Sequence, residues 1–414
     1  MKLIVQKFGG TSVQNSETRQ HAMNHIRRAI EQGYKAVVVV SAMGRQGDPY
    51  ATDTLLSLVG GKNTVLNNRE QDMLLSCGET ISSVVFTQAL KENGIKSTAM
   101  TGAQAGFITN NEHTNAKILE MKCGRLLQEL ETHDVVVVAG FQGAAKNGDI
   151  TTIGRGGSDT TAAALGAAVN AEWIDIFTDV NGMMTADPRI VSNARPLKVV
   201  TYNEVSNMAF QGAKVIHPRA VEIAMQAKIP IRIRSTYSDA PGTLVTTINK
   251  HQEFDIRERL VTGIAYVPNV SQIKVAAKEG QYNLQTEVFK AMATENISVD
   301  FINISPNGVL FTVAESVSAR AISALRECGY TPSIEENCAK VSVVGAGISG
   351  VPGVTAKIVT ALSEKDIRIL QSADSHTTIW VLVSGNDLTE AVNALHNVFQ
   401  LQEEEEQSTM MNDR

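Results

Sequence analysis

The chain has 414 residues, 43% hydrophobic and 19% charged, which is typical of a globular protein with room for two or three domains. Its net charge is −6, and it contains no basic block, which argues against a nucleic-acid-binding protein. No apolar run approaches the roughly 20 residues of a membrane-spanning helix, no secretory signal is evident, and four scattered cysteines give no disulfide framework, so we expect a cytoplasmic protein without a membrane segment.

The first predicted strand, residues 3–5, leads directly into the segment Lys7-Phe8-Gly9-Gly10 and then two hydroxyl residues. A fixed positive charge, exposed backbone N–H groups and hydroxyl donors at one point favour an anion, phosphate above all. The segment is not a Walker A loop, because that pattern occurs nowhere in the chain. Taken alone, it also fits a strand that ends in a glycine turn beside a surface lysine.

Strand-like and helix-like segments alternate through residues 1 to about 245. Runs of valine are typical of strands buried on both faces, as in a parallel sheet covered by helices. The predicted strands are 37–40, 135–138, 173–178 and 229–235, and the predicted helices are 16–32, 80–93, 115–131 and 159–169. This alternation predicts an α/β domain with helices on both faces of its sheet.

A glycine-rich segment, residues 154–159, precedes the alanine-rich predicted helix. Its glycines let the backbone approach a ligand, and Arg155 carries a planar guanidinium that suits a carboxylate or phosphate. Ser158 or Asp159 could cap the helix, whose free N–H groups favour an anion. The alternative is a capped helix behind a flexible loop, but capping has no use for an arginine among three glycines.

Three other segments carry polar residues at predicted element ends. Asp179 follows a buried strand, where ligands bind in open α/β sheets, although an Asx turn fits equally. Lys214 follows a glycine at a predicted helix end. Glu79 lies in what we expect to be the first turn of a helix, where a glutamate is also common for no functional reason.

The C-terminal part contains an internal repeat with a shift of 70 residues, which pairs Ala291 with Ala361 and Ile297 with Ile367. Such a repeat predicts two small domains of matched architecture. The G-x-G-x-x-G in residues 345–350 is better explained by close packing or effector contact than by a dinucleotide site. We therefore predict a large domain over 1–245, a linker over 246–260, small domains over 261–338 and 339–402, and an acidic disordered tail over 403–414.

Four motifs together resemble the monofunctional aspartokinases of the amino-acid kinase superfamily: KFGGTSV, GRGGSDTTAAALGAA, FTDVNGMMTADPR and GAKVIHPRAVEIA. The two repeats resemble paired ACT domains, and the likeness covers residues 1 to about 401. It is greatest to the diaminopimelate-sensitive group of Bacillus-type bacteria. The resemblance implies a three-layer αβα sandwich with a mostly parallel sheet, followed by two ferredoxin-like α+β domains.

The resemblance also implies that the protein transfers the γ-phosphoryl group of MgATP to the side-chain carboxylate of L-aspartate. This is the first step toward diaminopimelate, lysine, threonine and methionine. It implies catalytic roles for Lys7, Asp179 and Lys214. It places Lys7, Phe8, Gly9, Gly10, Thr178, Asp179, Met184, Arg189, Lys214 and Val215 at ATP, and Ser41, Thr52, Glu79, Arg155, Gly156 and Ser158 at aspartate. No protein metal site is expected, and Mg²⁺ enters with ATP.

By the same resemblance, the ACT pair binds an amino-acid effector, diaminopimelate first and lysine or threonine second. The expected effector residues are Gln281, Asn283, Gln285, Val299, Asp300, Pro352, Gly353, Val354, Gln371 and Ser372. We expect a homodimer or higher oligomer through the ACT domains, with an internally initiated regulatory subunit as a further possibility. The rival interpretations are another amino-acid kinase of the glutamate type and a catalytically silent amino-acid sensor.

Overall fold

The computed structural model describes residues 1–213, 215–247, 260–277, 283–346, 348 and 351–403. The chain divides into two compact units. The first comprises Met1–Met183, Pro196–Ala209 and Lys214–Ile256, and the second comprises Met184–Arg195, Phe210–Ala213 and Arg257–Arg414. Two short stretches of the predicted large domain therefore belong to the second unit, which differs from the single boundary that we placed near residue 245.

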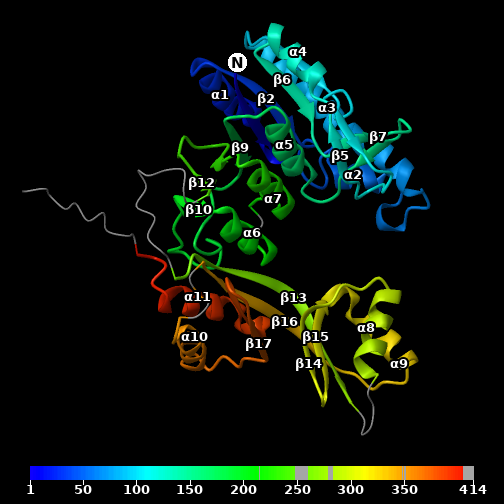
Figure 1. Cartoon of the computed structure of the whole chain (residues 1–414), viewed down its shortest axis with the longest axis vertical. Coiled ribbons are helices and arrows are strands. Elements are labelled where there is room, and N and C mark those ends of the chain that lie inside the picture. Colours follow the sequence, from blue (N-terminus) through cyan, green and yellow to red (C-terminus); the bar gives the residue numbers. More distant parts are fainter. Residues whose placement is uncertain (214, 248–259, 278–282, 347, 349–350, 404–414) are drawn as a thin grey trace, which may run out of the picture. The chain divides into compact units, whose positions relative to one another are not determined.

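An eight-stranded sheet forms the centre of the first unit, in the order β10-β12-β11-β9-β1-β2-β6-β3 (Figure 1). Neighbouring strands pair in parallel except β11 and β12. The strands are β1 (Lys2–Phe8), β2 (Tyr34–Val40), β3 (Ser97–Met100), β6 (Val135–Ala139), β9 (Trp173–Thr178), β10 (Val199–Thr201), β11 (Ile231–Ser235) and β12 (Thr243–Thr246). The predicted mostly parallel sheet is confirmed.

Helices cover both faces of this sheet. Alternate residues of each strand point to opposite faces, so even-numbered and odd-numbered residues pack against different helices. Ile4, Val38 and Val137 pack into one core with α1 and α3, whereas Val5 and Val39 face α5 on the other side. Because strand side chains alternate, an all-valine strand supplies apolar surface to both layers. The helices are α1 (Ser16–Glu31), α2 (Thr52–Ser57), α3 (Asn68–Glu92), α4 (Gly124–Thr132), α5 (Gly157–Ala168), α6 (Tyr202–Phe210) and α7 (Pro218–Ala227).

A smaller four-stranded sheet lies beside the main one, in the order β5-β4-β7-β8. Its strands are β4 (Phe107–Thr109), β5 (Ile118–Met121), β7 (Gln142–Ala145) and β8 (Ile150–Thr152). The helix that we predicted over 115–131 is therefore wrong in its first half, because residues 118–121 pair with β4. Only the second half of that stretch is helical, as α4.

Helix α3 begins well before the predicted residue 80, at a capping box in which Asn67 and Glu70 exchange hydrogen bonds. By length and composition α3 could cross a membrane, but half of its most apolar window is buried inside the domain. Its buried residues include Asp72 and Glu79. These features are those of a core helix of the first unit.

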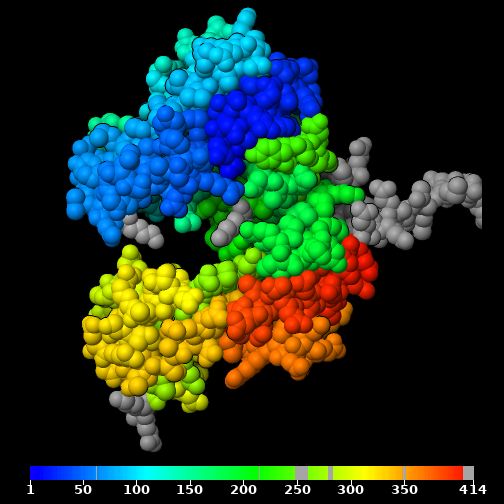
Figure 2. All heavy atoms as spheres, turned by 180° about the vertical axis from the view of Figure 1, so that it is seen from behind, coloured from blue at the N-terminus to red at the C-terminus, as the bar shows by residue number. Residues whose placement is uncertain are grey.

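The second unit is built on one six-stranded antiparallel sheet, in the order β14-β15-β13-β16-β18-β17. Figure 2 shows its two lobes, with α8 and α9 in the yellow lobe and α10 and α11 in the orange and red lobe. The elements are β13 (Gly263–Ala276), α8 (Leu284–Thr294), β14 (Asp300–Ser305), β15 (Gly308–Ala314), α9 (Ser318–Glu327), β16 (Ser333–Val344), α10 (Val354–Ser363), β17 (Gln371–Asp374), β18 (Thr378–Ser384) and α11 (Leu388–Val398).

The two lobes share the long strands β13 and β16. Ile264 and Val341 pack into the core of the lobe that contains α10 and α11, whereas Ile273 packs into the core of the lobe that contains α8 and α9. The repeated units predicted from the 70-residue shift are thus joined through two common strands. At the end of β16, a Cβ atom on Gly345 would lie 2.2 Å from the carbonyl oxygen of Leu260, so close packing explains this glycine of the G-x-G-x-x-G pattern.

Candidate active site

Three parallel strands of the first unit, β1, β2 and β9, end at one edge of the sheet, and predicted site residues lie at or just after their ends. Lys7 lies near the end of β1, Ser41 follows β2, and Thr178 ends β9. Helix α5 begins at the same edge, where the Ser41 hydroxyl donates to Ser158 Oγ over 2.9 Å. The sheet therefore brings the strand ends and a helix N-terminus together, as in ligand sites of open α/β sheets.

The Lys7 ammonium is held by a carboxylate on α5. Lys7 Nζ lies 2.7 Å from Asp159 Oδ1, and the two side chains are 14% and 13% exposed. The other oxygen, Asp159 Oδ2, accepts a hydrogen bond from the His217 backbone N–H over 3.1 Å. The sequence analysis considered Asp159 only as a helix cap and missed this pairing, although it adjoins the recognised glycine motif.

The glycine pair after Lys7 makes room for close backbone contacts. A Cβ atom on Gly10 would lie 2.5 Å from the Ala42 carbonyl oxygen, and Gly44 N–H donates to the Gly10 carbonyl over 2.9 Å. The Phe8 side chain is fully buried and stacks on Phe177 with ring centroids 4.7 Å apart. Of Phe8, only the backbone is available to a nucleotide.

Glu79 is a buried carboxylate at this edge. It lies in the middle of α3, not in the first helical turn as predicted, because Gly78 does not end the helix. Instead, Gly78 gives Ala42 room to approach: an added Cβ would lie 2.9 Å from that side chain. Glu79 is 2% exposed; Oε1 accepts from the Ala42 N–H over 3.1 Å, and Oε2 has no partner among the described residues. Burial raises its pKa to about 8.

Asp179 lies on the exposed side of the same edge. Its Oδ2 accepts from the Arg45 guanidinium over 3.1 Å, and its Oδ1 accepts from the Thr178 hydroxyl over 3.1 Å. Arg45 follows β2 and adds a cation that the sequence analysis did not single out. The only signal for it was its place just after the SAMG segment that follows β2.

The N-termini of α5 and α7 lie next to each other at the same edge of the sheet. Gly156 has φ +67°, and an added Cβ would lie 2.1 Å from the His217 ring, so this position requires glycine. Arg155 is exposed next to it, Thr52 is the half-buried first residue of α2, and Val215 is half-buried just before α7. Lys214 lies outside the described residues.

Met184 and Arg189 belong to the second unit. Arg189 is paired with Asp187 through Nε and Nη2, at 2.9 Å to Oδ1 and 2.6 Å to Oδ2. That pairing and its hydrogen bonds lower the pKa of Asp187 to about 2. The structure thus gathers predicted residues of the first unit that it describes at one edge, and it places Met184 and Arg189 in the unit built on the ACT-like sheet.

The predicted effector residues lie in both lobes of the second unit. Asp300 forms an ion pair with Lys340. Gln371 is buried, donates to the Phe301 carbonyl and accepts from the Gln272 amide over 2.9 Å. The remaining positions are Val299 before β14, Ser372 on β17, Asn283 and Gln285 at the start of α8, and Pro352, Gly353 and Val354 at the start of α10. Gln281 lies outside the described residues.

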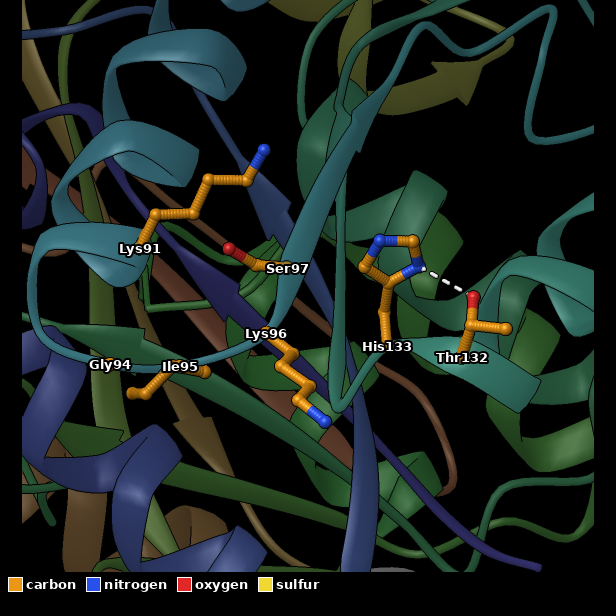
Figure 3. Close-up of a pocket in the computed structure, with 7 residues that line it drawn as sticks. All are labelled: Lys91, Gly94, Ile95, Lys96, Ser97, Thr132 and His133. Carbon is orange, nitrogen blue, oxygen red and sulfur yellow. Dashed lines mark hydrogen bonds between the residues drawn. The ribbon is translucent and has the colours of Figure 1, made fainter.

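A separate pocket of the first unit opens at the opposite edge of the sheet (Figure 3). Its lining includes Lys91, Lys96 and His133, close to where β3 and β6 begin. In Figure 3 the Lys91 and Lys96 side chains extend away from each other. Because ligands of open α/β sheets bind at the carboxyl ends of the strands, this pocket is not part of the candidate active site.

Comparison with known families assigns both units. Residues 2–235 match the amino acid kinase family, and residues 333–397 match the ACT domain. Among curated proteins, aspartokinase 1 of Bacillus subtilis is 67% identical over 402 residues, which cover 97% of this chain and 100% of that protein. An aspartokinase of Mycolicibacterium smegmatis is 40% identical, with 97% of each chain covered.

Solved structures of aspartokinases have the same architecture as this chain. E. coli aspartokinase III, crystallised with aspartate and ADP in its R-state, superposes with a TM-score of 0.77 at 26% identity, over 96% of this chain and 99% of that one. The aspartate kinase of Clostridium acetobutylicum superposes with a TM-score of 0.79 at 24% identity, over 96% of this chain and 100% of that one. The predicted sandwich followed by ACT-like domains is confirmed.

Proposed function

The chain belongs to the aspartokinases of the amino acid kinase family, and we propose that its edge site carries the γ-phosphoryl group of MgATP to the side-chain carboxylate of L-aspartate, yielding 4-phospho-L-aspartate and ADP. The observation that carries this proposal is the position of Lys7. Its ammonium is fixed by Asp159 at the point where β1, β2 and α5 meet. E. coli aspartokinase III, which has the same architecture, binds aspartate and ADP.

Phosphoryl transfer between these reactants needs charge compensation more than proton transfer. The aspartate carboxylate has an unperturbed pKa of about 4 and is ionised at neutral pH, so it needs no general base. The transferred group spreads negative charge over its oxygens, and a fixed cation stabilises that charge. We assign this role to Lys7, with Lys214 and the Mg²⁺ of MgATP as further cations and Asp179 as the catalytic carboxylate.

Aspartate would lie among groups that the structure brings to the α3 and α5 side of the site. The free oxygen of Glu79 is suited to the α-ammonium, and the exposed guanidinium of Arg155 to the α-carboxylate. Ser41 and Ser158, joined by a hydrogen bond, supply hydroxyls together with Thr52, and Gly156 keeps the backbone approach open.

ATP would contact the backbone of Lys7-Phe8-Gly9-Gly10, where a free turn can donate N–H groups to phosphate. Thr178 and Asp179 would meet it from the end of β9. The remaining contacts in this proposal are Met184, Arg189, Lys214 and Val215.

For the ACT pair we propose feedback inhibition by an end-product amino acid, diaminopimelate first, then lysine or threonine. The candidate contacts are the predicted effector residues, with the starts of α8 and α10 as sites for a carboxylate. The edge strand β14 exposes Ile302 and Ile304. A second chain that covers this edge would bury both side chains, which supports a homodimer or higher oligomer. An internally initiated regulatory subunit could take the place of the second chain. All four cysteines are unpaired, in keeping with a cytoplasmic location.

One assay separates this function from its rivals. The purified chain is incubated with MgATP and L-aspartate, L-glutamate or no amino acid, and both ADP release and acyl phosphate trapped by hydroxylamine are measured. We expect ADP and hydroxamate in equal amounts with aspartate alone. Product with glutamate instead would indicate a glutamate-type kinase, and no product with either would indicate an amino-acid sensor.

A further inference from the structure

Helix α3 carries a second buried carboxylate, Asp72, which the proposed function does not use. Asp72 is fully buried, at 0% exposure. It lies on the buried face of α3 that also carries Glu79, roughly two helical turns before it. A buried carboxylate is stable only when hydrogen-bond donors surround its oxygens. The donors that surround Asp72 therefore show which parts of the chain this side chain holds in place.

The partners of Asp72 belong to two other stretches of the first unit. The Thr114 backbone N–H donates to both carboxylate oxygens, over 3.0 Å to each. The Thr152 hydroxyl, at the end of β8, donates to Oδ1 over 2.5 Å, and His113 Nδ1 lies 2.9 Å from Oδ2. One carboxylate thus joins α3 to the end of β8 and to the loop between β4 and β5, residues 110–117.

This loop has an unusual backbone conformation at the residue that Asp72 holds. Thr114 has φ +68°, which a β-branched residue rarely adopts. Such a conformation persists only where surrounding contacts fix it, and the hydrogen bond shared between the Thr114 N–H and the two oxygens of Asp72 is a contact of that kind. Weakening the contacts of Asp72 should therefore let the loop relax toward an ordinary conformation.

The same loop packs against the chain immediately before Arg155. The Ala116 N–H donates to the Thr152 carbonyl over 2.9 Å. Gly154 has φ +77°, and an added Cβ atom would lie 2.7 Å from Asn115 Oδ1. Because the loop touches the chain up to the residue before Arg155, the position of the loop sets the position of that arginine.

Arg219 of α7 links the same two stretches a second time. Its guanidinium donates to the Ile153 carbonyl over 2.9 Å and to the Ala116 carbonyl over 3.3 Å. The loop and the end of β8 are therefore held together by Asp72 and by Arg219, and Arg155 follows directly from this rigid base.

Resting on the proposed roles of Glu79 and Arg155 in aspartate binding, we propose that Asp72 is a positioning residue for L-aspartate, which fixes the segment that carries Arg155. Because Asp72 and Glu79 belong to one helix, α3 then sets the spacing between the group that receives the α-ammonium and the group that receives the α-carboxylate. A displaced guanidinium loses part of its two-pronged contact with the carboxylate, which should weaken aspartate binding about three- to tenfold.

The test compares Thr152→Val with Thr151→Val in the full chain, since valine keeps the shape of threonine and removes only the hydroxyl. Thr151 is the matched control: it precedes Thr152 in β8, is equally buried, and its hydroxyl lies 2.6 Å from that of Thr109. Steady-state kinetics give kcat and both KM values, and thermal unfolding gives the Tm. We expect Thr152→Val to raise the aspartate KM about three- to tenfold, with kcat and the MgATP KM within about twofold of wild type. Thr151→Val should keep the wild-type KM values at a similar Tm.

Asp72→Asn is the stronger perturbation, because an amide nitrogen then faces donors that a carboxylate oxygen accepts from. It should raise the aspartate KM about tenfold or more, again without a matching rise in the MgATP KM. An Asp72→Asn protein with the aspartate KM of wild type would overturn the inference. If this variant does not fold, Thr152→Val decides.

Arg155→Ala and its double variant with Thr152→Val separate the inference from its premise. If Asp72 acts through Arg155, Thr152→Val has no further effect on the aspartate KM once Arg155 is alanine. An unchanged aspartate KM in Thr152→Val beside a raised one in Arg155→Ala would overturn the positioning role alone. An unchanged aspartate KM in Arg155→Ala would overturn the aspartate role of Arg155 and the inference with it, whereas aspartate-dependent ADP release by the wild type tests the kinase function separately. A Thr152→Val protein with a lower Tm and all kinetic constants worsened alike, or an equal rise of the aspartate KM in Thr151→Val, would show a merely structural role.

Discussion

The buried carboxylate of Glu79 makes aspartate binding depend on pH in a way that the structure specifies. Its pKa of about 8, set by burial and only partly offset by the hydrogen bond from Ala42, means that the free enzyme holds this group mostly protonated at pH 7. A neutral carboxyl cannot pair with the α-ammonium of aspartate. Binding therefore selects the minor ionised form, and its apparent affinity rises with pH.

The size of the effect follows from the fraction that is ionised. At pH 7 a group with a pKa of about 8 is roughly one-tenth ionised, and at pH 8.5 about three-quarters. The aspartate KM should thus fall about eightfold between these two pH values, because apparent affinity is proportional to the competent fraction. The MgATP KM should not follow this curve, since Glu79 is not expected to touch the nucleotide.

The assay is steady-state kinetics from pH 6.5 to 8.5 at saturating MgATP. Glu79→Gln should have a high aspartate KM that no longer changes with pH. Glu70→Gln is the matched control, because Glu70 lies in the same helix and serves its capping box, a role that glutamine also fills; it should keep the wild-type curve. A flat aspartate KM in the wild type, or a pH dependence that survives in Glu79→Gln, would refute the reasoning.

Three further predictions concern the same edge. Arg155→Lys should raise the aspartate KM about tenfold with little change in the MgATP KM, because a two-pronged contact is lost; unaltered aspartate saturation would remove Arg155 from the site. Gly156→Ala should lower the free energy of unfolding, measured with urea, by about 2–4 kcal/mol, because the added methyl group would collide with the His217 ring. Gly33→Ala should lower it by only about 1–2 kcal/mol, because Gly33 also has a positive φ, +84°, but open space around it. Equal losses of stability in the two variants would contradict the packing argument. The folded-state pKa of Glu79 lies above its unfolded value, so between about pH 4.5 and 8 the folded chain binds one more proton than the unfolded chain. The free energy of unfolding should therefore fall as the pH rises through that window, by at most roughly 4–5 kcal/mol. At pH 8, Glu79→Gln should unfold at a higher urea concentration than wild type, and a lower urea midpoint would count against the raised pKa.

The main sheet could be predicted from the sequence because each buried strand is a short run of apolar residues, which can be recognised without knowing its neighbours. The valine runs of β2 and β6 are apolar on both faces, and such runs are typical of strands covered on both sides. The glycine motifs at Gly10 and Gly156 could also be predicted, because a close backbone approach at Gly10 and a positive φ at Gly156 both require glycine.

The contacts that complete the site depend on residues distant in the chain. Lys7 and Asp159 pair across the sheet edge, and no local pattern connects them. Glu79 seemed to begin a helix because Gly78 suggests a break, but the glycine is needed for the approach of Ala42. Residues 118–121 became a strand because β4 offered a partner, which overrides helix propensity.

The regulatory unit shows the same limit. The 70-residue repeat predicted two matched lobes, yet it could not show that β13 and β16 serve both. Nor could the sequence show that Ala186 and Val191 pack with the ACT-like core, because a short apolar stretch in a loop does not specify its partner.

The central claim is that Lys7, fixed by Asp159, compensates the charge of the phosphoryl group as it passes between two anions. The most direct measurement is the kcat of Lys7→Ala beside that of Lys2→Ala, a lysine on the same strand that lies over the Tyr34 ring. Lys7→Ala should lower kcat on the order of 10²–10³-fold with the aspartate KM changed by less than about twofold, and Lys2→Ala should match wild type. A Lys7→Ala enzyme that turns over as fast as wild type would contradict the account.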